Sequence, residues 1–215
     1  MANIASVTLE VTDTAAADRF YTAAFGLGAP QLRLRASEAP TTGFRGFSLA
    51  LTVAQPADVD SLIASAVDAG ATVLKPATKS LWGYGGVLRA PDGAIWKLAT
   101  SAKKNTGPAT RRIDEFVLLL GVADFAESKR FYVSQGLAVA KSFGSRYAEF
   151  ESGPAEGPGG GPVKLALYRH RALAKEVGVT PEGTGSHRLV LGGDAADFTD
   201  PDGFPWETTA QAAAS

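Results

Sequence analysis

Few side chains in this sequence have the type and spacing needed for chemistry. The chain has two His and no Cys, which excludes a thiolate zinc site, a cysteine nucleophile and a disulfide framework. No Gly-x-Ser-x-Gly elbow precedes a helix, so the common serine nucleophile is missing too. The run Gly159–Gly161 lacks the Lys-Ser/Thr pair of a phosphate loop. Histidines, carboxylates and basic side chains therefore remain as candidates.

The overall charge and hydropathy exclude further classes of function. The chain has 215 residues, with 21 Lys plus Arg against 22 Asp plus Glu, so it lacks the basic excess that nucleic-acid binding usually needs. The longest apolar run, 116–123, is far shorter than the roughly 20 residues that cross a bilayer. The N-terminus does not resemble a signal peptide. We expect a soluble cytoplasmic protein with neither nucleic acid nor membrane as partner.

An internal repeat organises the chain. Residues 7–21 recur at 118–132, and in both copies a Phe-Tyr pair begins 7 positions after an Asp, at Asp13 and Asp124. Pro-Asp-Gly and a following Trp also occur twice, at 91–96 and 201–206. The repeat predicts two units, 1–100 and 112–209, joined by the polar linker 101–111 and followed by a disordered tail, 210–215.

Within each unit the pattern predicts a strand, a helix and several more strands. Alternating apolar residues mark a strand at 7–11, and Asp13 or Thr14 is placed to cap a helix that runs to about Ala24. Pro56 opens a second helix, which Gly70 ends. This order is typical of an α+β fold. We expect six aromatic residues to belong to the core: Phe20, Tyr21, Trp96, Phe131, Tyr132 and Trp206.

The strand ending in Asp, the helix containing Phe-Tyr and the closing Pro-Asp-Gly-x-x-Trp hairpin resemble the vicinal oxygen chelate superfamily, which includes glyoxalases, bleomycin-resistance proteins and dioxygenases. The resemblance covers nearly the whole chain. It implies tandem βαβββ modules that form curved mixed sheets around concave clefts, with the second module of the second unit too short for its helix.

In the metal-dependent members of that superfamily, His, Gln or Glu ligands lie on the first and closing strands of the modules. The resemblance places these positions at Ser6, Arg45 and Lys97 in unit one, which therefore cannot hold a metal in the family manner. In unit two they fall at Val117, Leu165, His187 and Glu207. We expect no cofactor. The alternative is a divalent ion, Ni, Zn, Mn or Fe, held by His187 and Glu207.

The two cations of unit one suggest a different site. If Arg45 and Lys97 face the cleft, they would attract a carboxylate, phosphate or enolate-like oxygen. Trp82 and Tyr84 would form the rim, and Ser6 would complete the ligand-binding set. The opposing interpretation is that Lys97 forms a salt bridge and Trp82 covers the edge of the core. His170, between two arginines, is expected to be a surface residue.

Three hypotheses follow for the function. The first is a metal-independent small-molecule-binding protein, a monomer or homodimer, that takes an anionic or planar aromatic ligand in the sheet cleft. The second is a divalent-metal-dependent glyoxalase-like lyase or isomerase, or a dioxygenase, that uses His187 and Glu207. The third is a scaffold or dimerisation module whose clefts have closed. The sequence favours the first.

Overall fold

The computed structural model describes residues 3–153 and 162–209. The predicted tail 210–215 and the run Gly159–Gly161 lie outside the described residues. Nineteen helices and strands occupy the described ranges. No helix among them is long and apolar enough to cross a membrane.

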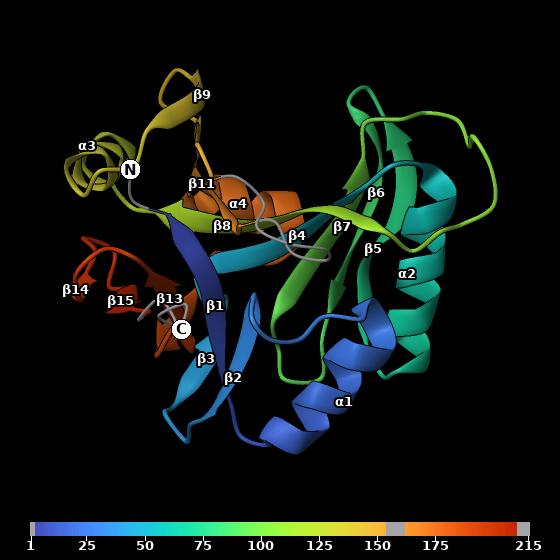
Figure 1. Cartoon of the computed structure of the whole chain (residues 1–215), viewed down its shortest axis with the longest axis horizontal. Helices are drawn as coiled ribbons and strands as arrows, with labels where there is room; N and C mark the ends of the chain where they lie inside the picture. Colours follow the sequence, from blue (N-terminus) through green and yellow to red (C-terminus); the bar gives the residue numbers. More distant parts are fainter. Residues whose placement is uncertain (1–2, 154–161, 210–215) are drawn as a thin grey trace, which may run out of the picture.

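The strands form two large curved sheets and one small sheet (Figure 1). The four helices are α1 (Thr14–Phe25), α2 (Pro56–Asp68), α3 (Phe125–Ser134) and α4 (His170–Val177). The five-stranded sheet has the order β14 (Phe198–Thr199), β15 (Pro205–Thr208), β13 (Leu189–Gly193), β1 (Ile4–Val11) and β2 (Leu32–Ala36). The small sheet pairs β12 (Gly183–Gly185) with β3 (Thr41–Gly43).

The eight-stranded sheet comes from the middle of the chain. Its order is β5 (Thr72–Ser80), β6 (Gly83–Arg89), β7 (Ile95–Thr100), β4 (Phe47–Val53), β8 (Ile113–Val122), β11 (Lys164–Arg169), β10 (Tyr147–Phe150) and β9 (Val139–Phe143). Few helices and many strands confirm the predicted α+β class with curved mixed sheets.

Local signals set the helix boundaries as the sequence predicts. The Asp13 carboxylate accepts a hydrogen bond from the amide of Ala16 at 2.9 Å, and Asp124 caps α3 in the same way. An acceptor at this position satisfies an amide that has no partner inside the helix. Gly26 ends α1 with φ 67°, a left-handed conformation that glycine adopts readily. Pro56 begins α2.

Each large sheet has two antiparallel strands at its centre, one from each predicted unit. β4 pairs with β8 in the eight-stranded sheet, and β1 pairs with β13 in the five-stranded sheet. Strands from 1–100 and 112–209 thus share both sheets. The division of the chain into two units at the linker stays a prediction.

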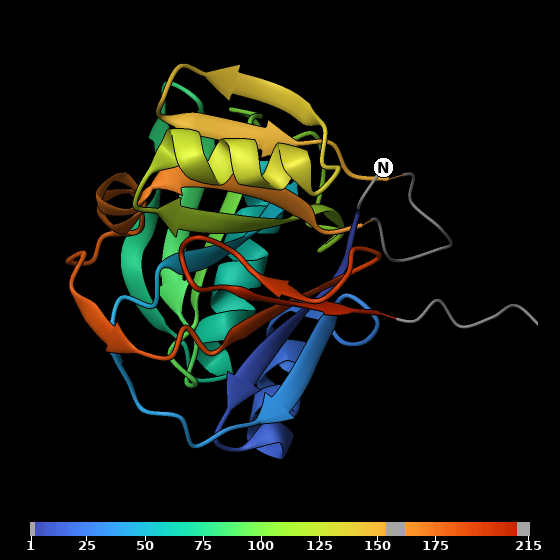
Figure 2. The ribbon, with the colours of Figure 1, turned by 90° about the vertical axis from the view of Figure 1, so that its left-hand side faces the viewer.

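The two Phe-Tyr pairs anchor helices to the closing turns. On α1, the buried Tyr21 packs against Trp96 with ring centroids 5.4 Å apart, and its hydroxyl donates to Asp92 at 2.6 Å. On α3, Tyr132 packs against Trp206 at 5.8 Å. In Figure 2, α3 crosses the outer face of β10 and β11. The predicted core aromatics are confirmed as buried, except Phe131, which is half-buried.

The linker is held against the rest of the chain. The Gln55 side chain accepts hydrogen bonds from the amides of Thr106 and Gly107, at 2.7 and 3.1 Å. Asp58, which is fully buried, accepts from Arg111 and Thr110. These hydrogen bonds hold residues 106–111 of the predicted linker against the N-terminus of α2.

Candidate functional site

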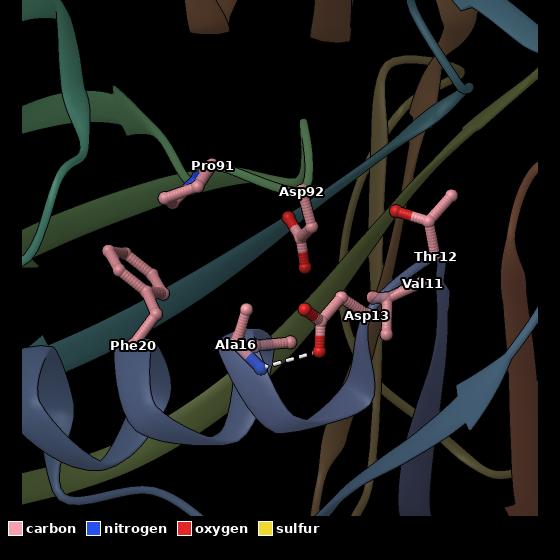
Figure 3. Close-up of a pocket in the computed structure, with 8 residues that line it drawn as sticks. Val11, Thr12, Asp13, Ala16, Phe20, Pro91 and Asp92 are labelled. Atoms are coloured by element: carbon pink, nitrogen blue, oxygen red, sulfur yellow. Dashed lines mark hydrogen bonds between the residues drawn. The ribbon is translucent and has the colours of Figure 1, made fainter.

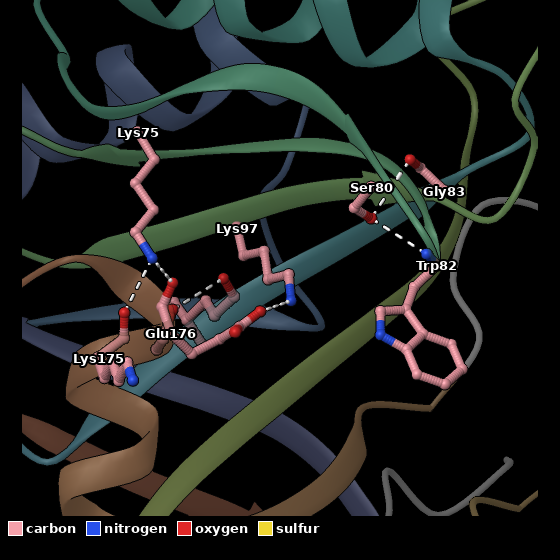
Figure 4. Close-up of polar contacts among 9 residues, drawn as sticks. Lys75, Ser80, Trp82, Gly83, Lys97, Lys175 and Glu176 are labelled. Atoms are coloured by element: carbon pink, nitrogen blue, oxygen red, sulfur yellow. Dashed lines mark hydrogen bonds and ion pairs between the residues drawn. The ribbon is translucent and has the colours of Figure 1, made fainter.

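A groove of about 310 Å³ lies on the concave face of the eight-stranded sheet, over β5, β6 and β7. Lys75, Lys97 and Glu176 line it, and Trp82 stands at its rim (Figure 4). Trp82 is 85% exposed, whereas Trp96 and Trp206 are buried in the core. An indole left in solvent offers a flat surface on which a planar molecule can stack. The structure thus brings together three of the predicted ligand-binding residues, Lys97, Trp82 and Tyr84, around one groove.

An ion pair occupies the inner end of the groove. The Lys97 ammonium donates a hydrogen bond to the Glu176 carboxylate of α4, and this bond lowers the pKa of Glu176. Lys75 donates to the main-chain carbonyl oxygens of Lys175 and Glu176 at 2.8 and 2.6 Å, where the negative end of the helix dipole favours a cation. Lys97 therefore forms the salt bridge that the sequence left open as its alternative role.

Helix α4, which the sequence analysis missed, fills the deeper part of the same concave face. Its Leu173, Ala174 and Val177 are fully buried, and they belong to one apolar cluster with residues of β4, β8 and β11. Gly178 ends the helix with φ 80°. Half of this cleft is therefore closed by the chain itself, and the groove beside Trp82 is the open half.

The strand register identifies one row of residues across the floor of this cleft. Lys97 on β7 pairs with Ala50 on β4, Ala50 pairs with Val117 on β8, and Val117 pairs with Lys164 on β11. The row runs across the two central strands and the strands flanking them, and it contains Lys97 and Val117, two of the positions at which the resemblance placed metal ligands. A lysine stands at each end.

Two positions at which the resemblance placed metal ligands, Leu165 and Arg45, do not lie in this row. Leu165 is buried in the core on the other face of the sheet, whereas its neighbour Lys164 pairs with Glu115 at 2.5 Å. Ala50, not Arg45, lies in the row with Lys97. Because successive residues of a strand face opposite sides, an offset of one residue exchanges the two faces.

Arg45 lies outside the groove, and Tyr84 lines it but also makes a structural contact. The Arg45 guanidinium donates to the Asp92 main-chain oxygen at 2.6 Å; burial lowers its pKa, and the nearby Asp92 carboxylate opposes this. The Tyr84 hydroxyl donates to Asp60 on α2 at 2.7 Å, a bond that raises the pKa of Tyr84, and its ring packs against the main core. The structure does not bring Arg45 and Lys97 together.

Ser6 and Glu207 meet on the other sheet. They lie in one pocket of about 220 Å³ on the five-stranded sheet, where Ser6 pairs with Gly192 and Gly192 pairs with Glu207. Arg35 donates two hydrogen bonds to the Glu207 carboxylate, at 2.8 and 2.6 Å, and these lower the pKa of Glu207. Gly192, not His187, occupies the row of Ser6 and Glu207.

Main-chain oxygens surround both histidines. The His187 ring nitrogens lie 2.6 Å from the Arg45 oxygen and 3.1 Å from the Asp202 oxygen, and its ring stacks on Phe204. His170 was expected at the surface. This expectation is wrong, because the half-buried ring starts α4 and lies within 3.3 Å of one main-chain oxygen and 2.8 Å of another.

A metal site is not assembled in the part of the chain that the structure describes. No group of three or more His, Asp or Glu side chains there could hold a metal ion. His187 is directed at main-chain oxygens, and Glu207 at Arg35. The donor sets needed to replace the water around a divalent ion usually have at least three members, so the two predicted ligands do not fit the ion as they stand.

A smaller cavity of about 130 Å³ lies between the N-terminus of α1 and the turn at Pro91 (Figure 3). Two carboxylates, Asp13 and Asp92, face it. Asp13 caps α1, and Asp92 accepts hydrogen bonds from the Tyr21 hydroxyl and the Ala94 amide. These oxygens serve the fold, which makes the cavity a weaker candidate than the groove.

Comparison with known proteins identifies the architecture. No protein-family model and no curated protein matches the chain. Among solved structures, glyoxalase I from Zea mays is similar with a TM-score of 0.60 and 16% sequence identity, covering 97% of this chain and 92% of that chain. The chain has the glyoxalase fold. A putative dioxygenase from Bacillus subtilis is similar with a TM-score of 0.59 and 10% identity, covering 96% of this chain and 84% of that chain.

This glyoxalase fold confirms the α+β class and the curved mixed sheets that the resemblance to the vicinal oxygen chelate superfamily implied. The strand register and α4 also identify two site residues that sequence reasoning missed, Lys164 and Glu176. Lys164 could have been found from the alternation of Lys164, Leu165, Ala166 and Leu167, which puts Lys164 and Ala166 on one face. Glu176 could have been found only with α4, whose Leu173, Ala174 and Val177 recur at helical spacing before Gly178.

Proposed function

We propose that the protein binds a planar, anionic small molecule in the groove beside Trp82, without a metal ion. The observation that carries the proposal is that Lys97 and the exposed Trp82 line the same groove. The ammonium would attract the anionic group, and the indole would stack on the planar part. The glyoxalase fold supports a cleft on this face of the sheet.

The charge of the row supports the same ligand class. Lys97 and Lys164 stand at its two ends. Each lysine side chain is about one quarter exposed, at 27% and 26%. Each ammonium is paired with a carboxylate, Lys97 with Glu176 and Lys164 with Glu115, so an anionic ligand would take the place of a carboxylate on a lysine, whereas the ammonium groups would repel a divalent cation.

Calorimetric titration with naphthalene-1-sulfonate, a planar anion, tests the proposal. We expect saturable binding to the wild type that Lys97→Gln weakens by about tenfold or more, because a charge-assisted hydrogen bond is lost. Lys79→Gln is the matched control, because Lys79 is an exposed lysine of β5 that is not among the residues lining the groove. Equal affinity in both variants would contradict the proposal.

The metal-dependent enzyme remains the competing function. Metal analysis of untagged protein separates the two. One tightly held Ni, Zn, Mn or Fe per chain, lost in His187→Ala, would overturn the proposed function in favour of a lyase, isomerase or dioxygenase.

The cytoplasmic location and the monomeric or dimeric state are also part of the proposal. Cell fractionation tests the location, and sedimentation measurements test the oligomeric state.

A further inference from the structure

The pocket on the five-stranded sheet has a chemistry of its own. Ser6 and Thr8 of β1 form its floor, together with Val190 and Gly192 of β13. Its rim carries Arg33 and Arg35 from β2 and Glu207, Thr208 and Thr209 from β15 and the residue after it. Hydroxyl and guanidinium groups therefore dominate the lining. Unlike the groove beside Trp82, this pocket holds no aromatic side chain.

A carboxylate is already held across this pocket. β2 and β15 are separated by β1 and β13, yet Arg35 reaches Glu207 and binds both of its carboxylate oxygens. The paired geometry is the one in which a guanidinium best recognises a carboxylate. Both side chains are nearly half exposed, 44% for Arg35 and 46% for Glu207. Because exposed ion pairs are weak, an external carboxylate can replace Glu207 on Arg35.

The floor of the pocket contains a hydroxyl without a partner. Ser6 is 1% exposed, and its Oγ has no hydrogen-bond partner among the described residues. A Cβ built at Gly192 would come within 2.4 Å of this oxygen, so the hydroxyl lies in the space that a side chain of the pocket floor would take. Buried hydroxyls are nearly always paired. The Ser6 hydroxyl is therefore a donor awaiting an acceptor in the pocket.

A second guanidinium is also available. Arg33 lies in register with Thr8 on the same sheet and is exposed. It makes no ion pair within residues 3–153 and 162–209. Arg35 also lies 3.8 Å from the Glu10 carboxylate, so Arg33 is the guanidinium of this pocket that has no carboxylate partner in the described ranges.

From these contacts we infer that the pocket is a second binding site, specific for a small carboxylic acid. The ligand carboxylate takes the place of the Glu207 carboxylate on Arg35. Arg33 and the Ser6 hydroxyl donate to its remaining oxygen atoms. Glu207 is then an internal competitor that leaves Arg35 when the ligand binds. The site is separate from the proposed groove and does not depend on it.

Amide NMR of the full-length chain titrated with acetate tests this inference, with chloride of equal ionic strength as the control. We expect saturable shifts at Ser6, Gly192 and Thr208. Glu207→Gln removes the competing carboxylate and is expected to tighten acetate binding by about tenfold. Ser6→Ala is expected to weaken it by about two- to tenfold, the value of one neutral hydrogen bond.

The same titration has outcomes that overturn the inference. These are equal acetate affinity in Glu207→Gln and the wild type, or pocket shifts that persist in Arg35→Gln. Lys97→Gln separates the two proposals: it should weaken naphthalene-1-sulfonate binding in the groove by about tenfold or more and leave the acetate shifts unchanged. A spectrum retaining native dispersion shows that each variant is folded.

Discussion

The two concave faces share a strand arrangement and differ in what fills it. On the eight-stranded sheet, the central row holds Lys97 and Lys164 at its ends, and α4 packs over the floor beside it. On the five-stranded sheet, the corresponding row holds Ser6, Gly192 and Glu207, and no helix of the described residues covers it. One face is therefore partly filled by the apolar core, while the other carries small polar residues.

An ion pair bridges each face, but the bridges differ. Lys97–Glu176 joins the sheet to a packed helix, whereas Arg35–Glu207 joins two strands of the same sheet. The first pair is therefore supported by apolar burial and the second is not. The comparison teaches that the same fold can close a cleft by hydrophobic packing or merely by a pair of exposed charges. The following measurements test this difference.

The largest expected effect is on stability. Leu173→Ala removes a fully buried side chain of α4 and should lower the free energy of unfolding by about 2–5 kcal/mol, through lost burial and the cavity left behind. Urea denaturation measures it. Arg171→Ala, an exposed position of the same helix, is the control and should change stability by less than about 0.5 kcal/mol. A similar small loss for Leu173→Ala would show that α4 is not part of the core.

The next effect is on ligand affinity. Glu176→Gln should tighten the binding of naphthalene-1-sulfonate by about tenfold, because it frees the Lys97 ammonium from a charged partner. Calorimetric titration checks this. Glu182→Gln, at an exposed carboxylate outside the groove, should leave the affinity unchanged. Unchanged affinity in Glu176→Gln would show that the ion pair does not restrict the groove.

The third effect concerns pH. The pKa values of Glu176 and Glu207 are lower than the usual 4.5 because Lys97 and Arg35 donate hydrogen bonds to them. A carboxylate whose pKa is lower in the folded state stabilises that state above its unfolded pKa, and this stabilisation is lost as the pH falls through the lowered value. Each partly exposed pair should contribute about 0.2–1 kcal/mol.

Urea unfolding at neutral pH and well below pH 4.5 measures this loss in the wild type and in the two Glu→Gln variants. Glu176→Gln should remove a larger part of this pH-dependent loss of stability than Glu207→Gln does. The reason is that the Lys97 side chain is less exposed than the Arg35 side chain, 27% against 44%. The reverse order would mean that packing by α4 does not strengthen its ion pair.

The smallest effect distinguishes ligand contact from structural support. Trp82→Ala should change the free energy of unfolding by less than about 0.5 kcal/mol, because the side chain is 85% exposed. The same variant should weaken naphthalene-1-sulfonate binding, because the stacking surface is lost. Thermal denaturation and titration of one preparation measure both. A marked loss of stability would favour the interpretation of Trp82 as a cover for the core edge.

Local features of the fold could be predicted from the sequence. The capping residue Asp13 and the start of α2 at Pro56 each depend on neighbours close in the chain. Glu176 could not be anticipated in the same way. It lies 79 residues from Lys97 in the sequence, and their contact depends on how α4 crosses the sheet.

Register was the main difficulty in locating site residues. The resemblance placed His187 and Glu207 together, but β13 begins at Leu189, and Gly192 is the residue opposite Glu207. A strand advances about 3.3 Å per residue, so an offset of five residues separates two predicted ligands by more than the diameter of a metal site. Residue types alone carry no information about such an offset.

The order of strands has a consequence for how the protein is made. The eight-stranded sheet uses only residues 47–169, an uninterrupted stretch, whereas β1 pairs with β13 near the opposite end of the chain. During synthesis, the larger sheet can assemble while β13 is still inside the ribosome. β1 and β2 emerge first and wait longest for their partner, with one edge of β1 unpaired. The sheet proposed to bind a carboxylic acid is thus completed after the eight-stranded sheet.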